Sequence, residues 1–230
     1  MSPAGGTGIV PAASGTGVRG VAARIGPFER HTEKYDTRFS RNWRAYRSEL
    51  EAVRIMLPHG RRSLEIGVGT GRFAALLGIR IGVEPSQSMA RIARERGVRV
   101  IGGIAEDLPL RGDQFDLALM VTILCFLDDV DGALREAHRV LSAGGSLVVG
   151  FVDRDSPVGR VYQERSGETL FYREAAFCSG KEVDCRLKSA GFHSLAYGQT
   201  IFTDPGQIRE LEPIREGYGE GCFAVARGMK

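Results

Sequence analysis

Three glycines at alternate positions, flanked by two carboxylates, are the residues of this chain best suited to hold a ligand. Gly67, Gly69 and Gly71 follow a short apolar run that contains Glu65, and Glu84 closes the next apolar run. Glycine lets a backbone turn tightly and approach a ligand closely because it has no Cβ atom. A carboxylate at the end of the second strand can accept two hydroxyl hydrogen bonds from a ribose. The pattern predicts a nucleotide-type cofactor at the carboxyl ends of two adjacent parallel strands.

Two cofactors compete for a loop of this kind, and the spacing favours one of them. A dinucleotide loop has the pattern G-x-G-x-x-G and places its pyrophosphate on the N-terminus of the next helix. Here the spacing is G-x-G-x-G, and Arg72 stands where the third dinucleotide glycine would be. Glu65 would repel a pyrophosphate, but it would attract the ammonium and sulfonium groups of S-adenosylmethionine. A nicotinamide-dependent oxidoreductase remains the alternative function.

The segments around this loop carry a family resemblance over residues 28–228. Residues 65–71 form the motif acid-x-G-x-G-x-G, and similar motifs follow at residues 82–86, 103–110, 115–121 and 141–147. Together they resemble the class I S-adenosylmethionine-dependent methyltransferases of the UbiE-like, methyltransferase type 11 family. The segments at 118–122, 152–154 and 216–221 look like those of uncharacterised small bacterial members. The resemblance implies methyl transfer, and the absence of a large insertion after the glycine loop favours a small-molecule acceptor.

The resemblance also implies which residues bind the cofactor. Glu84 would hold the ribose, and the loop at 103–110 would lie along the adenine. This chain has Ile104 where many relatives carry an adenine-binding acid, so we expect Glu106 or the backbone N–H groups near Ala105 to replace it. Ile104 and Met89 could enclose the ring by apolar contact. The predicted cofactor-binding set is Glu65, Gly67, Val68, Gly69, Gly71, Glu84, Pro85, Ser86, Met89, Ala105, Glu106 and Val121.

The acceptor side of the predicted site has no evident general base. Cys125 and Phe126 stand where many relatives carry a histidine pair. In-line displacement at a sulfonium needs alignment and exclusion of water, and it needs a base only when the nucleophile holds its proton tightly. Tyr35 and Cys125 are the candidate catalytic residues. The missing histidines and Ile104 leave a third alternative, a non-catalytic module that binds S-adenosylmethionine on the same fold.

The order of apolar runs predicts an α/β fold. We expect a Rossmann-like, doubly wound sheet of about seven strands, mostly parallel with an antiparallel C-terminal strand, and helices on both faces. Residues 1–24 are rich in small residues and predict a disordered tail, and residues 25–230 predict a single domain. Residues 28–57 would form a helical arm or lid, including an amphipathic helix at 40–57. The strand candidates are residues 63–66, 79–83, 98–101, 115–121, 146–152, 194–202 and 222–226.

Composition limits the partners and the location. The chain has 230 residues and a net charge of +3, and the basic side chains near its N-terminus are mixed with acids, so we expect a solvated helix face and no nucleic-acid partner. No apolar run approaches the ~18 residues that a membrane span requires. The four cysteines lack zinc spacing, so we expect no metal and a reduced, cytoplasmic protein. The sequence carries no signal for an oligomeric state.

Overall fold

The structure is a computed structural model that describes residues 25–58 and 62–230; the tail predicted at residues 1–24 lies outside the described residues. One mixed sheet has the strand order β3-β2-β1-β4-β5-β8-β6-β7. The first five strands are parallel, β8 is antiparallel to β5 and β6, and β7 is antiparallel to β6. The strands are β1 Ser63–Ile66, β2 Ile81–Val83, β3 Arg99–Ile101, β4 Phe115–Val121, β5 Leu141–Val152, β6 His193–Thr200, β7 Arg215–Glu216 and β8 Phe223–Met229.

The predicted fold class is confirmed; the bounds of β2, β3, β6 and β8 differ from the prediction by one to three residues, and two differences are larger. The sheet has eight strands where about seven were expected, because the two-residue strand β7 adds an edge that no apolar pattern indicates. Strand β5 begins at Leu141, five residues before the predicted start. Leu141 pairs with Phe115 and Ser146 pairs with Leu117, so the glycine turn between them is a bulge within one strand.

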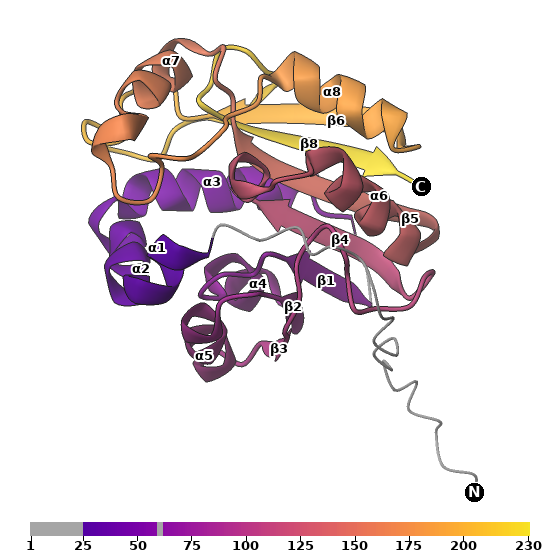
Figure 1. The fold of residues 1–230 in the computed structure, drawn as a ribbon. Helices are drawn as coiled ribbons and strands as arrows, with labels where there is room; N and C mark the ends of the chain where they lie inside the picture. The colour runs from indigo at the N-terminus through magenta and orange to yellow at the C-terminus, as the bar shows by residue number, and fades with distance from the viewer. Residues whose placement is uncertain (1–24, 59–61) are drawn as a thin grey trace, which may run out of the picture.

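Helices cover both faces of the sheet (Figure 1). They are α1 Gly26–Arg30, α2 Thr32–Arg41, α3 Trp43–Met56, α4 Arg72–Leu77, α5 Gln87–Glu95, α6 Val130–Val140, α7 Pro157–Glu164 and α8 Gly180–Ser189. Apolar residues of α3, α4 and α5 pack on one face, and those of α6 and α8 pack on the other. None of the helices described is long and apolar enough to cross a membrane.

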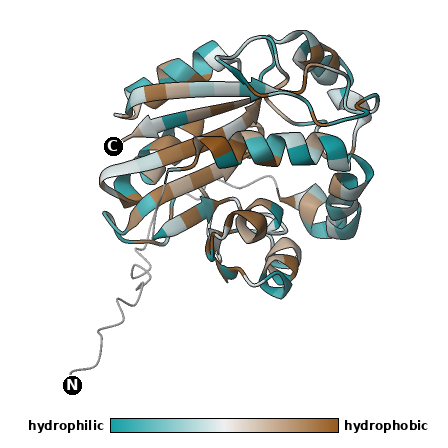
Figure 2. Ribbon diagram, turned by 180° about the vertical axis from the view of Figure 1, so that it is seen from behind, coloured by the Kyte–Doolittle hydropathy of each residue, from teal (hydrophilic) through white to brown (hydrophobic). Residues whose placement is uncertain are grey.

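The alternation of side chains along β4 explains why this strand is central. Leu117, Leu119 and Val121 contact the face that carries α3, while Ala118 and Met120 contact the face that carries α6. Both faces are therefore apolar, as expected for a parallel strand that is covered on both sides. Figure 2 shows the same distribution, with hydrophobic residues concentrated in the central strands and hydrophilic residues on the outer turns of the helices.

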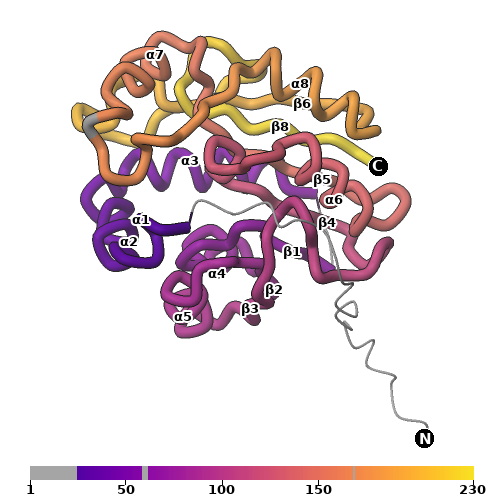
Figure 3. Tube along the Cα trace, in the orientation of Figure 1, coloured from indigo at the N-terminus to yellow at the C-terminus, as the bar shows by residue number. Residues whose placement is uncertain are grey.

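The N-terminal arm differs from its prediction in where its helices break. The amphipathic helix predicted at 40–57 begins at Trp43, since Asn42 has φ −107° and ψ 43° and leaves the helical region. The segment before it forms α1 and α2, which break at His31. We call α1, α2 and α3 together the arm. Figure 3 shows that the start of the arm lies beside α4 and α5, far along the chain, and α1 contacts α5 directly.

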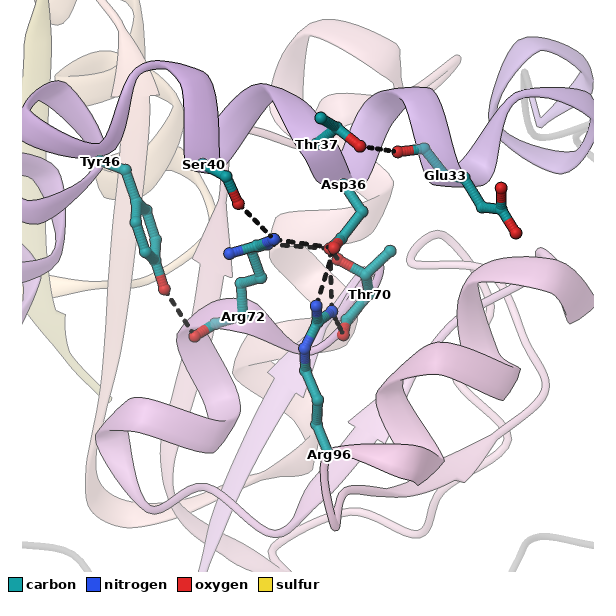
Figure 4. Close-up of polar contacts among 8 residues, drawn as sticks. All are labelled: Glu33, Asp36, Thr37, Ser40, Tyr46, Thr70, Arg72 and Arg96. Carbon is teal, nitrogen blue, oxygen red and sulfur yellow. Dashed lines mark hydrogen bonds and ion pairs between the residues drawn. The ribbon is translucent and has the colours of Figure 1, made fainter.

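Two carboxylates attach the arm to the glycine loop region. Asp36 of α2 forms bidentate ion pairs with both Arg72 and Arg96, at N···O distances of 2.7–2.9 Å, and accepts a hydrogen bond from the Thr70 hydroxyl at 2.7 Å (Figure 4). Glu29 of α1 accepts hydrogen bonds from the serines at the start of α5, Ser86 and Ser88. Charge-assisted bidentate pairs are strong and geometrically specific, so they fix the arm in one position. We call Asp36, Thr70, Arg72 and Arg96 the Asp36 cluster.

The Asp36 cluster should contribute measurably to stability. The Asp36 side chain is only 17% exposed, and its arginine partners hold its pKa well below the usual range, although burial opposes them. We expect Asp36→Asn to lower the free energy of unfolding by about 1.5–3 kcal/mol, since hydrogen bonds to charged groups contribute this much. Glu95→Gln is the matched control because Glu95 pairs with Arg91 at an exposed site, and it should cost under about 0.5 kcal/mol. Urea denaturation followed by circular dichroism measures both; equal losses would contradict the assignment.

The turn after β1 depends on glycine for two different reasons. Gly67 and Gly69 have φ values of 68° and 54°, in the left-handed region. A Cβ atom on Gly67 would lie 2.6 Å from Cγ2 of Ile123, whereas one on Gly69 would have no neighbour within 4 Å. The Gly67 position is therefore restricted by both conformation and space.

This difference predicts unequal costs for the two alanine variants. Both pay about 1–2 kcal/mol for the left-handed backbone. Gly67→Ala should lose about 1–3 kcal/mol more, because its methyl group would displace Ile123. Unfolding free energies from denaturant titration give the comparison, with Gly69→Ala as the control. A Gly69 variant that proved less stable than the Gly67 variant would show that the contact with Ile123 is not limiting.

Candidate functional site

A cleft lies at the carboxyl ends of β1, β2 and β4, where the strand order leaves a switch point between β1 and β4. In open α/β sheets, ligands bind at such points. The cleft has a volume of about 870 Å³ out to its open mouth, within the range of sites for small molecules and cofactors. The glycine loop forms its floor, and the arm closes one side.

Most of the residues predicted to bind a cofactor line this cleft. They are Glu65, Gly67, Val68, Gly69, Glu84, Pro85, Met89, Ala105, Glu106 and Val121. Gly71 and Ser86 do not line it. Gly71 starts α4 and packs against Ala93 of α5. Ser86 is fully buried and caps α5, where its hydroxyl accepts a hydrogen bond from the Met89 N–H at 3.2 Å.

Glu84 connects the end of β2 to the glycine loop. Its Oε2 accepts a hydrogen bond from the Gly69 N–H at 2.8 Å, and its Oε1 accepts one from the Ser86 N–H at 2.9 Å. Burial raises the pKa of Glu84 to about 7, although these two N–H groups oppose the shift. A carboxylate has about four acceptor sites, so each oxygen can still accept a hydroxyl hydrogen bond from the cleft.

Glu65 is a buried carboxylate with an unsatisfied oxygen. It is 2% exposed, and its Oε2 has no hydrogen-bond partner among the described residues. Burial raises its pKa well above the usual value; a hydrogen bond from the Ala74 backbone opposes this shift and the neighbouring Glu84 adds to it. An unpaired carboxylate in such a place is costly unless a ligand supplies a donor or a cation. The cleft therefore suits a ligand with a positive group near the glycine loop.

A second unsatisfied carboxylate oxygen lies in the loop after β3. Glu106 accepts a hydrogen bond from the Asp128 N–H at 3.1 Å, while its Oε2 is buried without a partner in the described part of the chain. Ile104 and Met89 also line the cleft. The loop thus offers one free acceptor between apolar side chains, an arrangement that suits a flat ring with an amino group.

Aromatic residues of the arm cover the cleft. The ring of Phe28 lies 4.9 Å from that of Phe126 and 5.3 Å from that of Tyr35, between centroids. Tyr35 lines the cleft, and its hydroxyl contacts Thr122. Desolvation raises the pKa of Tyr35 far above its usual value. These contacts shield the Tyr35 hydroxyl from solvent, which keeps its proton in place.

Cys125, the other candidate catalytic residue, lies outside the cleft. It is 7% exposed and packs with Phe171, Tyr172 and Phe177. Its Sγ lies 3.7 Å from the Thr122 carbonyl oxygen, and burial raises the pKa of the thiol. A thiol in these surroundings stays protonated and unreactive at neutral pH. Among the described residues, no group of three His, Cys, Asp or Glu side chains is arranged to hold a metal ion.

Several lining residues were not in the predicted set. Those from the arm carry no motif of their own, and only their membership of a predicted lid could have indicated them. Phe126 had been noticed only as a replacement for a histidine, and Ile104 only as an apolar contact of the ring. Arg72 was noticed only for its spacing, yet its guanidinium pairs with Asp36 of the arm. The additional lining residues are Ile25, Phe28, Phe39, Thr70, Arg72, Phe73, Gly103, Ile104, Thr122, Ile123, Phe126 and Leu127.

Comparisons with known proteins agree with this geometry. A family model described as a methyltransferase domain matches residues 64–149. An uncharacterised protein of Methanocaldococcus jannaschii is 43% identical over 203 residues, which cover 88% of this chain and 98% of that protein. An uncharacterised protein of Mycobacterium tuberculosis is 37% identical over 182 residues, 78% of this chain and 64% of that protein.

A solved structure extends the likeness to the whole fold. It is described as an S-adenosylmethionine-dependent methyltransferase, possible histamine N-methyltransferase, from Thermotoga maritima. It is 51% identical, the match covers 90% of this chain and 99% of that one, and the TM-score is 0.87. The chain therefore belongs to the S-adenosylmethionine-dependent methyltransferases, and S-adenosylmethionine is its cofactor.

Proposed function

We propose that this protein is an enzyme that transfers the methyl group of S-adenosylmethionine to a small-molecule acceptor by in-line displacement. The observation that carries the proposal is the buried, unpaired Glu65 oxygen beside the glycine loop. The methionine portion of S-adenosylmethionine carries an ammonium group and a sulfonium, and a cation of this kind next to Glu65 would favour its ionised form despite burial. A pyrophosphate would meet repulsion there, which disfavours the nicotinamide alternative.

The remaining parts of the cofactor have matching residues. Glu84 would accept hydrogen bonds from the ribose hydroxyls, and the free oxygen of Glu106 would accept one from the adenine amino group. Ile104 and Met89 would contact the ring. When bound, the cofactor would supply a methyl group activated by its cationic sulfur. The lone pair of an acceptor would form a bond to the methyl carbon while the bond from that carbon to sulfur breaks. The protein has to align that acceptor and keep water away.

The aromatic residues of the arm would shield the reacting atoms from water, and neither Tyr35 nor Cys125 is suited to act as a base. Burial raises the pKa of both the Tyr35 hydroxyl and the Cys125 thiol, so neither group is ionised near neutral pH. We infer that the acceptor atom carries a free lone pair when it reacts, such as a neutral nitrogen. A nucleophile of this kind needs no proton transfer before the displacement.

The proposal predicts a methylated product from a panel of small nucleophiles. The Thermotoga maritima relative is described as a possible histamine N-methyltransferase, so histamine belongs in the panel beside other amines, thiols and phenols. Purified protein with S-adenosylmethionine should yield a product 14 Da heavier than one member, together with S-adenosylhomocysteine, by mass spectrometry. Tight binding of S-adenosylhomocysteine without any product across the panel would favour the non-catalytic module instead.

Cofactor affinity should depend on pH through Glu84. Its raised pKa of about 7 means that the carboxylate gains a proton as the pH falls from 8 to 6 and then loses acceptor capacity toward the ribose. We expect S-adenosylhomocysteine to bind more weakly at pH 6 than at pH 8. Glu84→Gln should weaken binding at pH 8 by about 1–3 kcal/mol, since charged hydrogen bonds are lost, and should reduce the pH dependence.

Isothermal titration calorimetry at three pH values measures this effect. Glu95→Gln serves as the control, because it removes an exposed carboxylate of α5 that lies outside the cleft. Glu65→Gln separates the second titrating carboxylate of the cleft from Glu84. A Glu84→Gln variant with unchanged affinity at pH 8 would show that Glu84 does not bind the ribose.

A further inference from the structure

A second cavity adjoins the cofactor cleft, and no part of the cofactor has been assigned to it. It has a volume of about 680 Å³ to its opening and lies between α2, α3, α7 and the ends of β4, β6 and β8. The two cavities share three wall residues, Tyr35, Phe39 and Thr122. We call it the acceptor cavity, because a molecule inside it would face the cofactor cleft across that shared wall. Its other polar lining residues include Arg38, Asn42, Glu49, Tyr162 and Tyr172.

The cation in this cavity already has partners. The Arg38 guanidinium donates a hydrogen bond from Nη2 to the Tyr162 hydroxyl at 3.0 Å, and its carbon lies 4.6 Å from the ring centroid of Tyr172. Further ring faces, those of Tyr35 and Phe171, lie 5.8 Å away. Cation–π contacts and a phenol thus compensate much of the charge of Arg38. An acidic ligand is not needed to satisfy it.

The carboxylate in this cavity lacks such partners. Glu49 projects from the face of α3 that carries Tyr46 and lines the cavity. It makes no hydrogen bond or ion pair with the residues that the structure describes, and Arg38 is the charged group whose proximity favours its ionised form. Burial raises the pKa of Glu49 to about 7, and Arg38 opposes the shift. Glu49 is partly buried, and an unpaired carboxylate that is largely shielded from water is a cost to the folded protein that a donor from a ligand would remove.

Two strained residues lie on the wall of the same cavity. Thr122 has φ 54° and Ile201 has φ 64°, and both line the acceptor cavity. Both are β-branched, and β-branched residues in the left-handed region are outliers. Such strain persists only where the surrounding structure enforces it, and it gathers at ligand sites. The strain is independent of the charges: Thr122 lies on the wall shared with the cofactor cleft, and Ile201 lines the acceptor cavity.

We propose that the acceptor cavity binds the methyl acceptor, and that Glu49 holds a protonated amino group of that acceptor. The inference rests on the proposed methyltransferase function and adds the substrate class: a small molecule that carries an ammonium group for Glu49 and a separate lone-pair atom directed at the shared wall. Tyr46, Tyr162 and Tyr172 also line the cavity, and aromatic walls of this kind accommodate an alkylammonium group. Glu49 itself repels an anion.

The test compares amines with alcohols of the same shape. The pairs are butylamine and 1-butanol, 2-phenylethylamine and 2-phenylethanol, and 2-(pyridin-3-yl)ethylamine and 2-(pyridin-3-yl)ethanol. Each is titrated by calorimetry into the full chain saturated with S-adenosylhomocysteine, at pH 8, where alkylamines are protonated and Glu49 is ionised. We expect at least one amine to bind about tenfold or more tightly than its alcohol, as a charge-assisted hydrogen bond provides.

The variant Glu49→Gln should remove this preference and bring each amine within about twofold of its alcohol. Glu51→Gln is the matched control, because Glu51 lies on the same helix and pairs with Arg47 and Arg54 at the surface. It should keep the preference. Both variants should bind S-adenosylhomocysteine like the parent, because neither residue lines the cofactor cleft.

The outcomes separate this inference from the function on which it rests. If the parent binds S-adenosylhomocysteine but no amine better than its alcohol, the assignment of the cavity to an amine is wrong. If the preference survives in Glu49→Gln, Glu49 is not the residue that recognises the ammonium group. If the parent fails to bind S-adenosylhomocysteine, the proposed function fails and the inference fails with it. Thermal unfolding at pH 8 checks that the Glu49→Gln variant is folded. The protonated form of Glu49 is the one that stabilises the folded protein, and it is lost as the pH rises through about 7. At pH 8 the substitution therefore removes no stabilising contribution of this carboxyl.

Discussion

The hydrogen bond from the Gly69 N–H to the Glu84 carboxylate is the contact on which the site depends. It joins the loop after β1 to the end of β2, so the floor of the cleft and the predicted ribose acid are held as one unit. The left-handed backbone of Gly67 and Gly69 is required for that N–H to point at Glu84. A side chain at Gly67 would push against Ile123, which lies in the turn after β4. Three strand ends are thus connected through one short loop.

Burial of carboxylates gives the site its chemical character. Glu65, Glu84 and Glu49 are all held in surroundings that raise their pKa values, and none of the three has an arginine or lysine as a direct ion-pair partner among the described residues. Asp36 shows the contrast. It is paired with two arginines, its pKa is lowered, and it serves to attach the arm. Among these four carboxylates, the three without an ion pair line a cavity, whereas the ion-paired Asp36 attaches the arm.

More of the lining of the cofactor cleft than of the acceptor cavity had been named from the sequence, for a physical reason. Strand β4 was predicted with its observed bounds because its apolar run is continuous and both of its faces are covered. The glycine loop is a local motif, so its residues could be identified by spacing alone. The acceptor cavity is assembled from segments far apart in the chain, and Glu49 resembles Glu51 until the helix is placed on the sheet. Helix α7 was missed although Ser156-Pro157 is a recognisable start for a helix.

The two cavities divide the chain into parts that can change separately. The predicted cofactor residues occupy one continuous stretch, from Glu65 to Val121, whereas most of the acceptor cavity comes from the arm and from the chain after β5. Only Tyr35, Phe39 and Thr122 belong to both. Substitutions in α3 or near Ile201 would therefore alter the proposed acceptor site while the lining of the cofactor cleft stays the same. Substitutions at these three shared positions would act on both cavities directly. A fold of this kind can therefore acquire new substrates through changes in its N-terminal and C-terminal segments while the central segment that lines the cofactor cleft is kept.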